Sequence, residues 1–391
     1  MTTPTALERA HRRLEDHSAS CVVIGSAPGR VNLIGEHVDH EDGVVLPIAI
    51  DRRAVVTVAT SGDQATILGA PDIDALIRVD GPPPQAPIEN AEFANHLLGV
   101  LKAAGGIDTP LHLAIFSDVP IGAGVSSSAA IEVACGAAFA AWRGDELPDP
   151  RTLAAWARAA EHEFVGTPCG WMDMLASAAG RRNHALRIDC RDLSIDPIPL
   201  PPPDEMAVLL FDSGVRHRLS DGGYADRLKA CERVRAALGK SMRDASLEDL
   251  DRADIAETDR KRGRHVITEM MRVEAAVEDL RRGDLDSFGR RLFEGHESLR
   301  TLYEVSIPEL DRIVDTARGL AGSGVHGARM TGGGFGGTAL VLVDPSRLDE
   351  VRTAIVADFE SKFGRVPPSW VALTDDGVRI EHRQLLPDSH P

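Results

Sequence analysis

The chain has 391 residues, which is more than one hydrophobic core usually fills, so we expect two lobes. Its 43% hydrophobic and 26% charged residues are typical of a globular protein and exclude a disordered or membrane-embedded class. The formal net charge of −17 opposes binding to nucleic acid or anionic lipid, so a phosphate-bearing ligand must be held by local groups.

The N-terminal residues and the cysteines predict the cellular location. The start of the chain is rich in charged residues and has no apolar core, so we expect no secretory signal. No later stretch approaches the roughly 20 apolar residues that span a bilayer. The five cysteines are widely spaced and lack a CxxC pair, which favours neither a disulfide framework nor a zinc site. We therefore expect a cytoplasmic protein without a membrane partner.

The first half of the chain predicts strands followed by helices. Apolar runs predict strands at 21–24, 54–59 and 111–116, and residues 29–39 (GRVNLIGEHVD) lie between the first two. A glycine-rich break then precedes a helix of small residues from Ser127 to Trp142. Further helices are predicted at 151–164 and from Trp171 onward, with Asp173 in the first turn of the latter.

A proline-rich run marks the expected connection between the lobes. Residues 197–203 (PIPLPPP) cannot continue a helix or a central strand. We therefore divide the chain into an N-terminal lobe, 1–198, and a C-terminal lobe, 199–391. For the second lobe, patterning predicts strands at 206–211 and 338–343 and helices at 221–304, 308–320 and 346–362.

Residues 120–130 (PIGAGVSSSAA) place glycines and hydroxyls at the start of a predicted helix. Unpaired N–H groups and the helix dipole favour an anion there, so the segment can cradle a triphosphate. The residues expected at this cradle are Gly122, Gly124, Ser126, Ser127, Ser128 and Ala129. A tight turn with a serine N-cap is the alternative, and the Walker lysine is missing. The Ser128 hydroxyl and the Glu161 carboxylate are oxygen ligands that suit Mg²⁺.

Several segments together resemble a known family. Residues 29–39 are similar to the galactokinase signature, and residues 120–130 resemble the second motif of the GHMP kinase superfamily. Residues 329–337 (RMTGGGFGG) resemble the third motif as galactokinases carry it. Similar stretches follow in family order at 160–162, 168–173, 215–217, 264–266, 298–300 and 303–306. The sequence is thereby identified as a member of the galactokinase family.

The resemblance implies an α+β fold of two lobes, with the active site between them. It also implies transfer of the γ-phosphoryl group of ATP to the anomeric hydroxyl of a sugar, with Mg²⁺ as cofactor. Sugar and ATP are the expected partners. We expect a monomer, with a homo-oligomer left open.

The resemblance also implies roles for single residues. Asp173 would accept the proton of the sugar hydroxyl or orient it, and Arg30 would stabilise the anionic nucleophile and the phosphoryl group. Phe93 would stack on adenine where the family often has tryptophan. Apart from the resemblance, Tyr303 is expected to pack because it lies in a helical pattern, and His217 and His265 are expected to bind no metal because they are far apart without a third ligand. The sugar would be bound by Glu36, His37, Asp39, Gly170 and Tyr224.

One departure from the family pattern leaves the sugar open. After the signature histidine, galactokinases usually read Thr-Asp-Tyr-Asn-x-Gly, whereas residues 38–43 read VDHEDG. The alternatives to galactose are N-acetylgalactosamine, arabinose and a uronate, and the added acids would repel a uronate. A non-catalytic sugar sensor is a third reading, which the intact residues 126–130, Arg30 and Asp173 disfavour.

Overall fold

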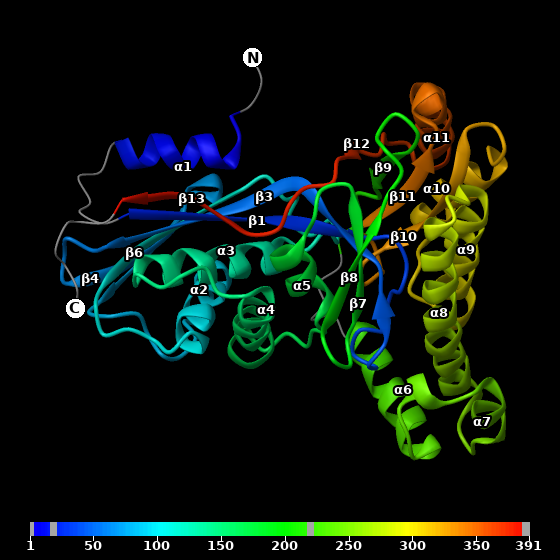
Figure 1. The fold of residues 1–391 in the computed structure, drawn as a ribbon, viewed down its shortest axis with the longest axis horizontal. Helices are drawn as coiled ribbons and strands as arrows, with labels where there is room; N and C mark the ends of the chain where they lie inside the picture. Colours follow the sequence, from blue (N-terminus) through cyan, green and yellow to red (C-terminus); the bar gives the residue numbers. More distant parts are fainter. Residues whose placement is uncertain (1–3, 16–21, 217–222, 385–391) are drawn as a thin grey trace.

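The first lobe is built on a six-stranded sheet with the order β13-β1-β3-β6-β4-β5 (Figure 1). The computed structural model describes residues 4–15, 22–216 and 223–384. Neighbouring strands are antiparallel except for β4 and β6, which are parallel. The strands are β1 (Val22–Asn32), β3 (Pro47–Thr60), β4 (Ala65–Ala70), β5 (Ala75–Asp80), β6 (Leu111–Ser117) and β13 (Arg379–Gln384).

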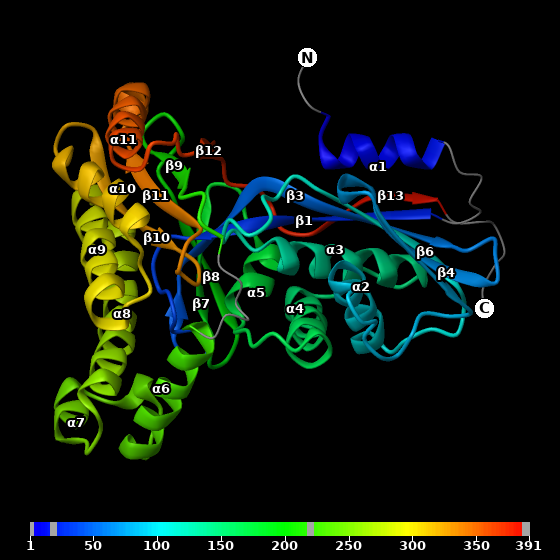
Figure 2. The ribbon, with the colours of Figure 1, turned by 180° about the vertical axis from the view of Figure 1, so that it is seen from behind.

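Helices cover both faces of this sheet (Figures 1 and 2). The side chains of a strand alternate between its two faces. Val23 joins the large core beneath α3, whereas Ile24 and Val55 pack with Ala6 and Ala10 of α1. The helix on this second face is α1 (Ala6–Glu15), and those on the first are α2 (Glu92–Ala103), α3 (Ser127–Trp142), α4 (Pro150–Ala159) and α5 (Met172–Ala179).

The second lobe contains a four-stranded antiparallel sheet with the order β10-β11-β9-β12. Its strands are β9 (Ala207–Asp212), β10 (Val325–Thr331), β11 (Thr338–Val343) and β12 (Ser369–Ala372). Helices α6 and α7 extend beyond the sheet at the bottom of Figure 1. The helices are α6 (Gly223–Leu238), α7 (Leu247–Arg252), α8 (Glu257–Arg281), α9 (Leu285–Ser298), α10 (Pro308–Gly319) and α11 (Leu348–Phe363).

A small sheet with the order β2-β7-β8 lies between the lobes (Figure 1). Its strands are β2 (Val44–Val45), β7 (His184–Asp189) and β8 (Ser194–Pro199). β8 is an edge strand, which tolerates Pro197 and Pro199 because its outer N–H groups need no partner. The proline run therefore begins inside a strand, and only its later residues form the connection to β9. The division of the lobes at 198/199 stays a prediction.

The last strand returns to the first lobe. β13 pairs with β1 in antiparallel register, with Val22 opposite Gln384 and Ser26 opposite Arg379. Residues 379–384, which the sequence places in the second lobe, thus complete the sheet of the first. Arg53 of β3 strengthens this return, because its guanidinium donates to Asp375 Oδ2 at 2.8 Å and to the carbonyl of Gly377 at 2.8 Å.

Most predicted elements are confirmed, with three differences. The strand predicted at 21–24 continues to Asn32, because residues 30–32 pair with residues 47–49 of β3 after a bulge, and Cys21 lies outside the described residues. The helix predicted at 151–164 ends in a π-helical turn, Ala160–Val165. The pattern at 221–304 is divided into α6, α7, α8, α9 and a π-helical turn, Leu299–Tyr303.

Two features concern membrane-spanning helices and cysteines. Among the described residues, no helix combines the length and the apolar character needed to cross a membrane. The cysteines of the described part, Cys135, Cys169, Cys190 and Cys231, are free thiols.

Candidate active site

Arg30 and Asp173 form an ion pair where the end of β1 meets the first turn of α5. Arg30 Nε lies 2.8 Å from Asp173 Oδ1, and Arg30 Nη1 donates to the carbonyl of Gly124 at 2.6 Å. The Arg30 side chain is 5% exposed, whereas that of Asp173 is 32% exposed. The Arg30 guanidinium is therefore held by buried contacts, whereas one side of the Asp173 carboxylate is open to solvent.

Ser126 supplies a further donor to the same carboxylate. Its hydroxyl donates to Asp173 Oδ2 at 2.6 Å. Ser126 occupies the N-cap position of α3 with φ +60°, but its side chain makes no capping hydrogen bond. The serine N-cap considered as an alternative is therefore not found, and Ser126 helps to orient Asp173.

The glycine-rich segment before α3 turns through positive φ at Gly122, Gly124 and Ser126. The turn leads directly into the first residues of α3, Ser127, Ser128 and Ala129, whose N–H groups are at the helix N-terminus. The third motif approaches this segment from the second lobe. A Cβ at Gly332 would lie 2.9 Å from the carbonyl oxygen of Gly124, so glycine is required there. The two glycine-rich motifs thus meet backbone to backbone.

Ser128 and Glu161, the predicted Mg²⁺ ligands, lie together. Ser128 Oγ is 3.1 Å from both carboxylate oxygens of Glu161. Burial and the neighbouring Glu132 raise the pKa of Glu161 to about 8. Glu132 is fully buried, with one oxygen 2.8 Å from His96 Nδ1 and the other without a hydrogen-bond partner among the described residues. Hydroxyl and carboxylate oxygens are the donor set that a hard divalent cation prefers, so these residues fit Mg²⁺.

His37 lies in the turn after β1 with its ring against two tyrosines. The ring centroids are 4.5 Å from Tyr303 and 5.6 Å from Tyr224. Burial and the nearby His40 lower the pKa of His37 well below its ordinary value, so the ring is neutral. Its Nε2 is buried without a hydrogen-bond partner in the described part of the chain. This nitrogen is available to a ligand.

Asp39 lies against the backbone of Gly170. A Cβ at position 170 would be 1.9 Å from Asp39 Oδ2, so no other residue leaves room for this carboxylate. Burial raises the pKa of Asp39, but His40 and His37 outweigh it and lower the pKa overall. Asp39 is therefore a buried, ionised acceptor. The sequence predicts Gly170 for close sugar approach, and the structure shows it making space for Asp39.

Tyr224 joins this group from the first turn of α6. Its ring lies 6.2 Å from that of His40. Burial, followed by the charges of Asp39 and Asp173, raises the pKa of its hydroxyl well above the ordinary value. The predicted sugar contacts from the first lobe thus meet the predicted tyrosine from the second.

Glu36 has a different environment from the other predicted sugar contacts. It is 1% exposed and forms an ion pair with Arg329, whose guanidinium also lies 2.9 Å from Glu269 Oε1. Burial raises the pKa of Glu36 to about 7, although Arg329 opposes the shift. The carboxylate is engaged by β10 of the second lobe, so its direct contact with sugar stays a prediction.

Sequence reasoning missed this buried network between the lobes. Thr331 adds to it, since its hydroxyl donates to the carbonyl of Asn32 at 3.0 Å. A signal was present: Arg329 belongs to the third motif, and Glu269 follows His265 by one helical turn. Helix α8 contains both His265 and Glu269, so the motif at 264–266 lies on the helix that contributes Glu269 to the network.

Of the remaining predicted residues, Tyr303 and His265 pack beside Glu36 and His37, whereas Phe93 packs on α2. Phe93 is half-buried near the start of α2 and packs against the apolar core. Tyr303 is fully buried and packs as predicted. His265 is hydrogen-bonded, with Nδ1 2.8 Å from Ser298 Oγ and Nε2 3.2 Å from the carbonyl of Glu36. His217 lies outside the described residues.

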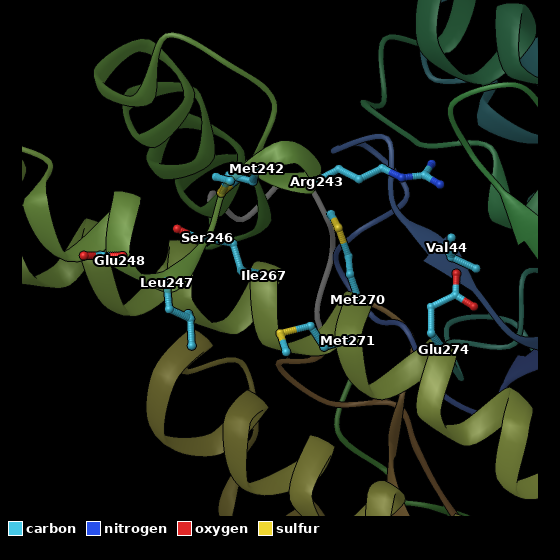
Figure 3. Close-up of a pocket in the computed structure, with 11 residues that line it drawn as sticks. Val44, Met242, Arg243, Ser246, Leu247, Glu248, Ile267, Met270, Met271 and Glu274 are labelled. Atoms are coloured by element: carbon cyan, nitrogen blue, oxygen red, sulfur yellow. The ribbon is translucent and has the colours of Figure 1, made fainter.

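A pocket of about 640 Å³ lies against α8, away from these residues (Figure 3). Its lining is mostly apolar, with Arg243 and Glu274 toward one side in Figure 3. The other lining residues are Val44, Met242, Ala245, Ser246, Leu247, Glu248, Ile267, Met270 and Met271. None of the predicted site residues is among them, so the pocket is separate from the predicted reaction site.

Sequence comparisons agree with this geometry. The galactokinase galactose-binding signature matches residues 9–60, and the GHMP kinase N-terminal and C-terminal domains match residues 92–181 and 276–361. The galactokinase of Bos taurus is 40% identical over 390 residues, which cover 96% of this chain and 97% of that protein. The galactokinase of Chloroflexus aggregans is 41% identical over 377 residues, which cover 91% and 92%.

Solved structures show the same fold. The crystal structure of Lactococcus lactis galactokinase complexed with galactose superposes with a TM-score of 0.88 at 28% identity, covering 96% of this chain and 100% of that one. A mevalonate kinase structure, at 17% identity and a TM-score of 0.62, shares the fold. The predicted α+β GHMP kinase fold is therefore confirmed. On this similarity along nearly its whole length, the chain belongs to the galactokinase family of the GHMP kinases and is a sugar phosphotransferase.

Proposed function

We propose that this enzyme transfers the γ-phosphoryl group of ATP to the anomeric hydroxyl of D-galactose, giving galactose 1-phosphate and ADP. The observation that carries the proposal is the Arg30–Asp173 ion pair, which contacts the glycine-rich segment before α3 through the carbonyl of Gly124. The names of the relatives, and the galactose in the Lactococcus lactis complex, support the choice of sugar.

Phosphoryl transfer depends mainly on alignment and on charge stabilisation, with little covalent work for the protein. Asp173 accepts the proton of the anomeric hydroxyl or orients that hydroxyl, using the exposed side of its carboxylate. Arg30 places a fixed positive charge beside the attacking oxygen and the transferred group. Since Ser126 and Arg30 hold the carboxylate, its orientation is set before substrate binds.

The N-terminus of α3 is assigned to the triphosphate. The backbone N–H groups of residues 122–129 would bind the phosphate oxygens, and Ser128 and Glu161 would hold Mg²⁺. When bound, Mg²⁺ neutralises charge on the phosphates. Phe93 stacks on adenine.

Three side chains are assigned to the sugar hydroxyls. His37 offers its unpartnered Nε2 to a hydroxyl, and Asp39 accepts two hydroxyl hydrogen bonds. Tyr224, on α6, lies beside His37 and completes the set of sugar contacts. Gly170 keeps the space that Asp39 needs. We further assign the activity to a cytoplasmic monomer whose lobes divide near residue 198, with β13 returning to the first lobe.

The two added acids do not require a different sugar. Glu41 is 2% exposed and lies 3.5 Å from the guanidinium of Arg235. The side chain of Asp42 is 51% exposed and lies 4.0 Å from Arg191. Glu41 and Asp42 each face an arginine, so we assign the sugar contact to Asp39 rather than to them.

A panel of sugars tests the proposal. Purified enzyme with ATP and Mg²⁺ is assayed for ADP release with D-galactose, N-acetylgalactosamine, arabinose, galacturonate and D-glucose. The highest kcat/KM is expected for D-galactose. Equal turnover of D-galactose and D-glucose would contradict the choice of sugar, and sugar binding without ADP release would indicate a sensor.

A further inference from the structure

Beside the loop that carries Asp39, three side chains with metal-binding atoms converge. They are His40 and Glu41, which follow Asp39 directly, and Cys231 in the middle of α6. One ligand atom from each lies within 4.8 Å of the other two. Glu41 is 2% exposed, Cys231 is fully buried, and the His40 side chain is 12% exposed.

The polar atoms of this cluster lack ordinary partners. Nε2 of His40 and Oε2 of Glu41 are buried without a hydrogen bond in the described part of the chain. The other ring nitrogen of His40, Nδ1, faces Asp39 Oδ1 at 3.4 Å. Unsatisfied buried polar atoms are rare in folded proteins and call for a ligand. Arg235 Nε lies 3.5 Å from the same Glu41 oxygen, but its side chain is 43% exposed and can turn toward solvent.

The donor set selects the class of cation. A thiolate, an imidazole and a carboxylate together suit Zn²⁺ and similar divalent transition metals rather than Mg²⁺ or Ca²⁺. Cys231 Sγ lies 3.5 Å from the hydroxyl of Tyr303, which can donate to a thiolate. Three protein ligands would leave a fourth position open.

The surroundings of His40 match those of a metal-ligating histidine. Such a histidine usually directs its second ring nitrogen toward a carboxylate, which fixes the orientation of the ring. His40 Nδ1 lies 3.4 Å from Asp39 Oδ1. This leaves Nε2 as the nitrogen for the metal and makes Asp39 the outer partner.

We propose that His40, Glu41 and Cys231 bind Zn²⁺ or a chemically similar divalent transition metal, and that the bound metal sets the position of Asp39 through His40. The metal site stands independently of the proposed function, whereas its effect on the sugar rests on the proposed contact with Asp39. Because galactokinases usually carry Tyr and Asn in place of His40 and Glu41, the site distinguishes this chain from that pattern. His40 and Glu41 are adjacent, but Cys231 lies 190 positions after Glu41, so no spacing motif marks the site.

Cobalt spectroscopy tests the site directly. The full-length enzyme, stripped of metal by dialysis against a chelator, is titrated with Co²⁺ in the absence of ATP and Mg²⁺. We expect one equivalent of tightly bound Co²⁺ with a thiolate-to-metal charge-transfer band, and loss of that band when Zn²⁺ is added. Binding without a thiolate band, as at surface carboxylates, would overturn the site.

Matched variants assign the ligands. Cys231→Ser should abolish the charge-transfer band, whereas Cys190→Ser, which changes another buried thiol, should keep it. The double variant His40→Tyr, Glu41→Asn introduces the residues that galactokinases usually carry, and should lower Co²⁺ affinity about 100-fold. This variant decides the question even if Cys231→Ser fails to fold. An unchanged affinity in the double variant would overturn the proposal.

Calorimetry of sugar binding tests the link to Asp39. Zn²⁺ should change the Kd for D-galactose at least threefold in the wild type and leave it unchanged in the His40→Tyr, Glu41→Asn variant. An identical Kd with and without bound Zn²⁺ would overturn the link. Absence of galactose binding in both states would instead refute the proposed substrate, while the cobalt spectrum would still report the site.

Discussion

Arg30 and Asp173 lie 2.8 Å apart, Nε to Oδ1, although 142 positions of the chain separate them. The guanidinium is almost fully buried, and the carboxylate is about one-third exposed. A nearly buried cation thus holds an anion that keeps one side open to solvent. This relationship supports the complementary roles proposed for the two residues, Arg30 toward the phosphoryl group and Asp173 toward the hydroxyl.

Asp173→Asn should lower kcat by about 10²- to 10⁴-fold, because the amide cannot accept the proton of the hydroxyl. The Kd for sugar should change less than about threefold, since the amide still hydrogen-bonds. Coupled ADP-release assays and calorimetry measure the two quantities. Asp145→Asn is the control, because Asp145 pairs with Arg143 at an exposed site and should leave both unchanged. Wild-type turnover in Asp173→Asn would refute the assigned role.

Glu161→Gln should raise the Mg²⁺ concentration for half-maximal activity by about 10- to 100-fold, because it removes the anionic ligand. Ser128→Ala should act in the same direction with a smaller effect. Glu163→Gln is the matched control, since Glu163 lies on the same π-helical turn but is exposed. Activity profiles against free Mg²⁺ are the measurement. Equal profiles for the two glutamine variants would exclude Glu161 as a ligand.

Gly170→Ala should raise the KM for sugar by at least 10-fold. The new Cβ would lie 1.9 Å from Asp39 Oδ2, so the carboxylate must leave its position. Gly62→Ala is the control, because a Cβ at position 62 meets no atom within 4 Å. Steady-state kinetics at saturating ATP distinguish the two variants. A KM for Gly170→Ala within twofold of wild type would show that Asp39 does not determine sugar binding.

The positions of Asp173 and of the Ser128–Glu161 pair were predictable from short segments, whereas the fold followed from the family resemblance. Asp173 was expected in the first turn of a helix because Gly166, Pro168 and Gly170 interrupt the chain before it, and α5 begins at Met172. Ser128 and Glu161 were expected together because Mg²⁺ needs oxygen ligands, and the structure places them 3.1 Å apart. Local patterning and ligand chemistry were sufficient for both.

The other features of the site and of the fold depend on contacts between segments that are distant in the sequence. The sequence motif predicts that Glu36 contacts the sugar. Its burial against Arg329 and Glu269 instead follows from how β10 and α8 pack on the turn after β1. The return of β13 to β1 is likewise a matter of chain topology, which strand propensity does not specify. His40 and Cys231 form no spacing pattern at all.

Arg329→Met should lower the free energy of unfolding by about 3–5 kcal/mol, because it leaves two buried carboxylates without their shared cation. Arg329 is fully buried between Glu36 and Glu269. Arg78→Met is the control: its pair with Asp63 is more than half exposed, and its removal should change the free energy by less than about 1 kcal/mol. Urea unfolding measures both. Equal losses in the two variants would contradict a structural role for the buried network.

His265, on the same helix as Glu269, makes the stability of the protein depend on pH. It is fully buried, and burial lowers its pKa to about 4, although Glu269 opposes the shift. The ordinary value is about 6.5, so between pH 6.5 and 4 the unfolded chain binds a proton that the folded chain does not. The contribution of His265 is therefore fully present above pH 6.5 and is lost as the pH falls toward 4.

His265→Gln should accordingly flatten the dependence of stability on pH. The wild type loses about 3 kcal/mol through His265 between pH 6.5 and 4, from 1.36 kcal/mol per pKa unit, and the variant does not lose it. The variant is less stable at pH 7.5, because glutamine cannot replace both hydrogen bonds, to Ser298 and to the Glu36 carbonyl. Urea midpoints at several pH values give the slopes, and His162→Gln, an exposed control, should follow the wild type. Parallel slopes for wild type and His265→Gln would mean that His265 titrates normally in the folded protein.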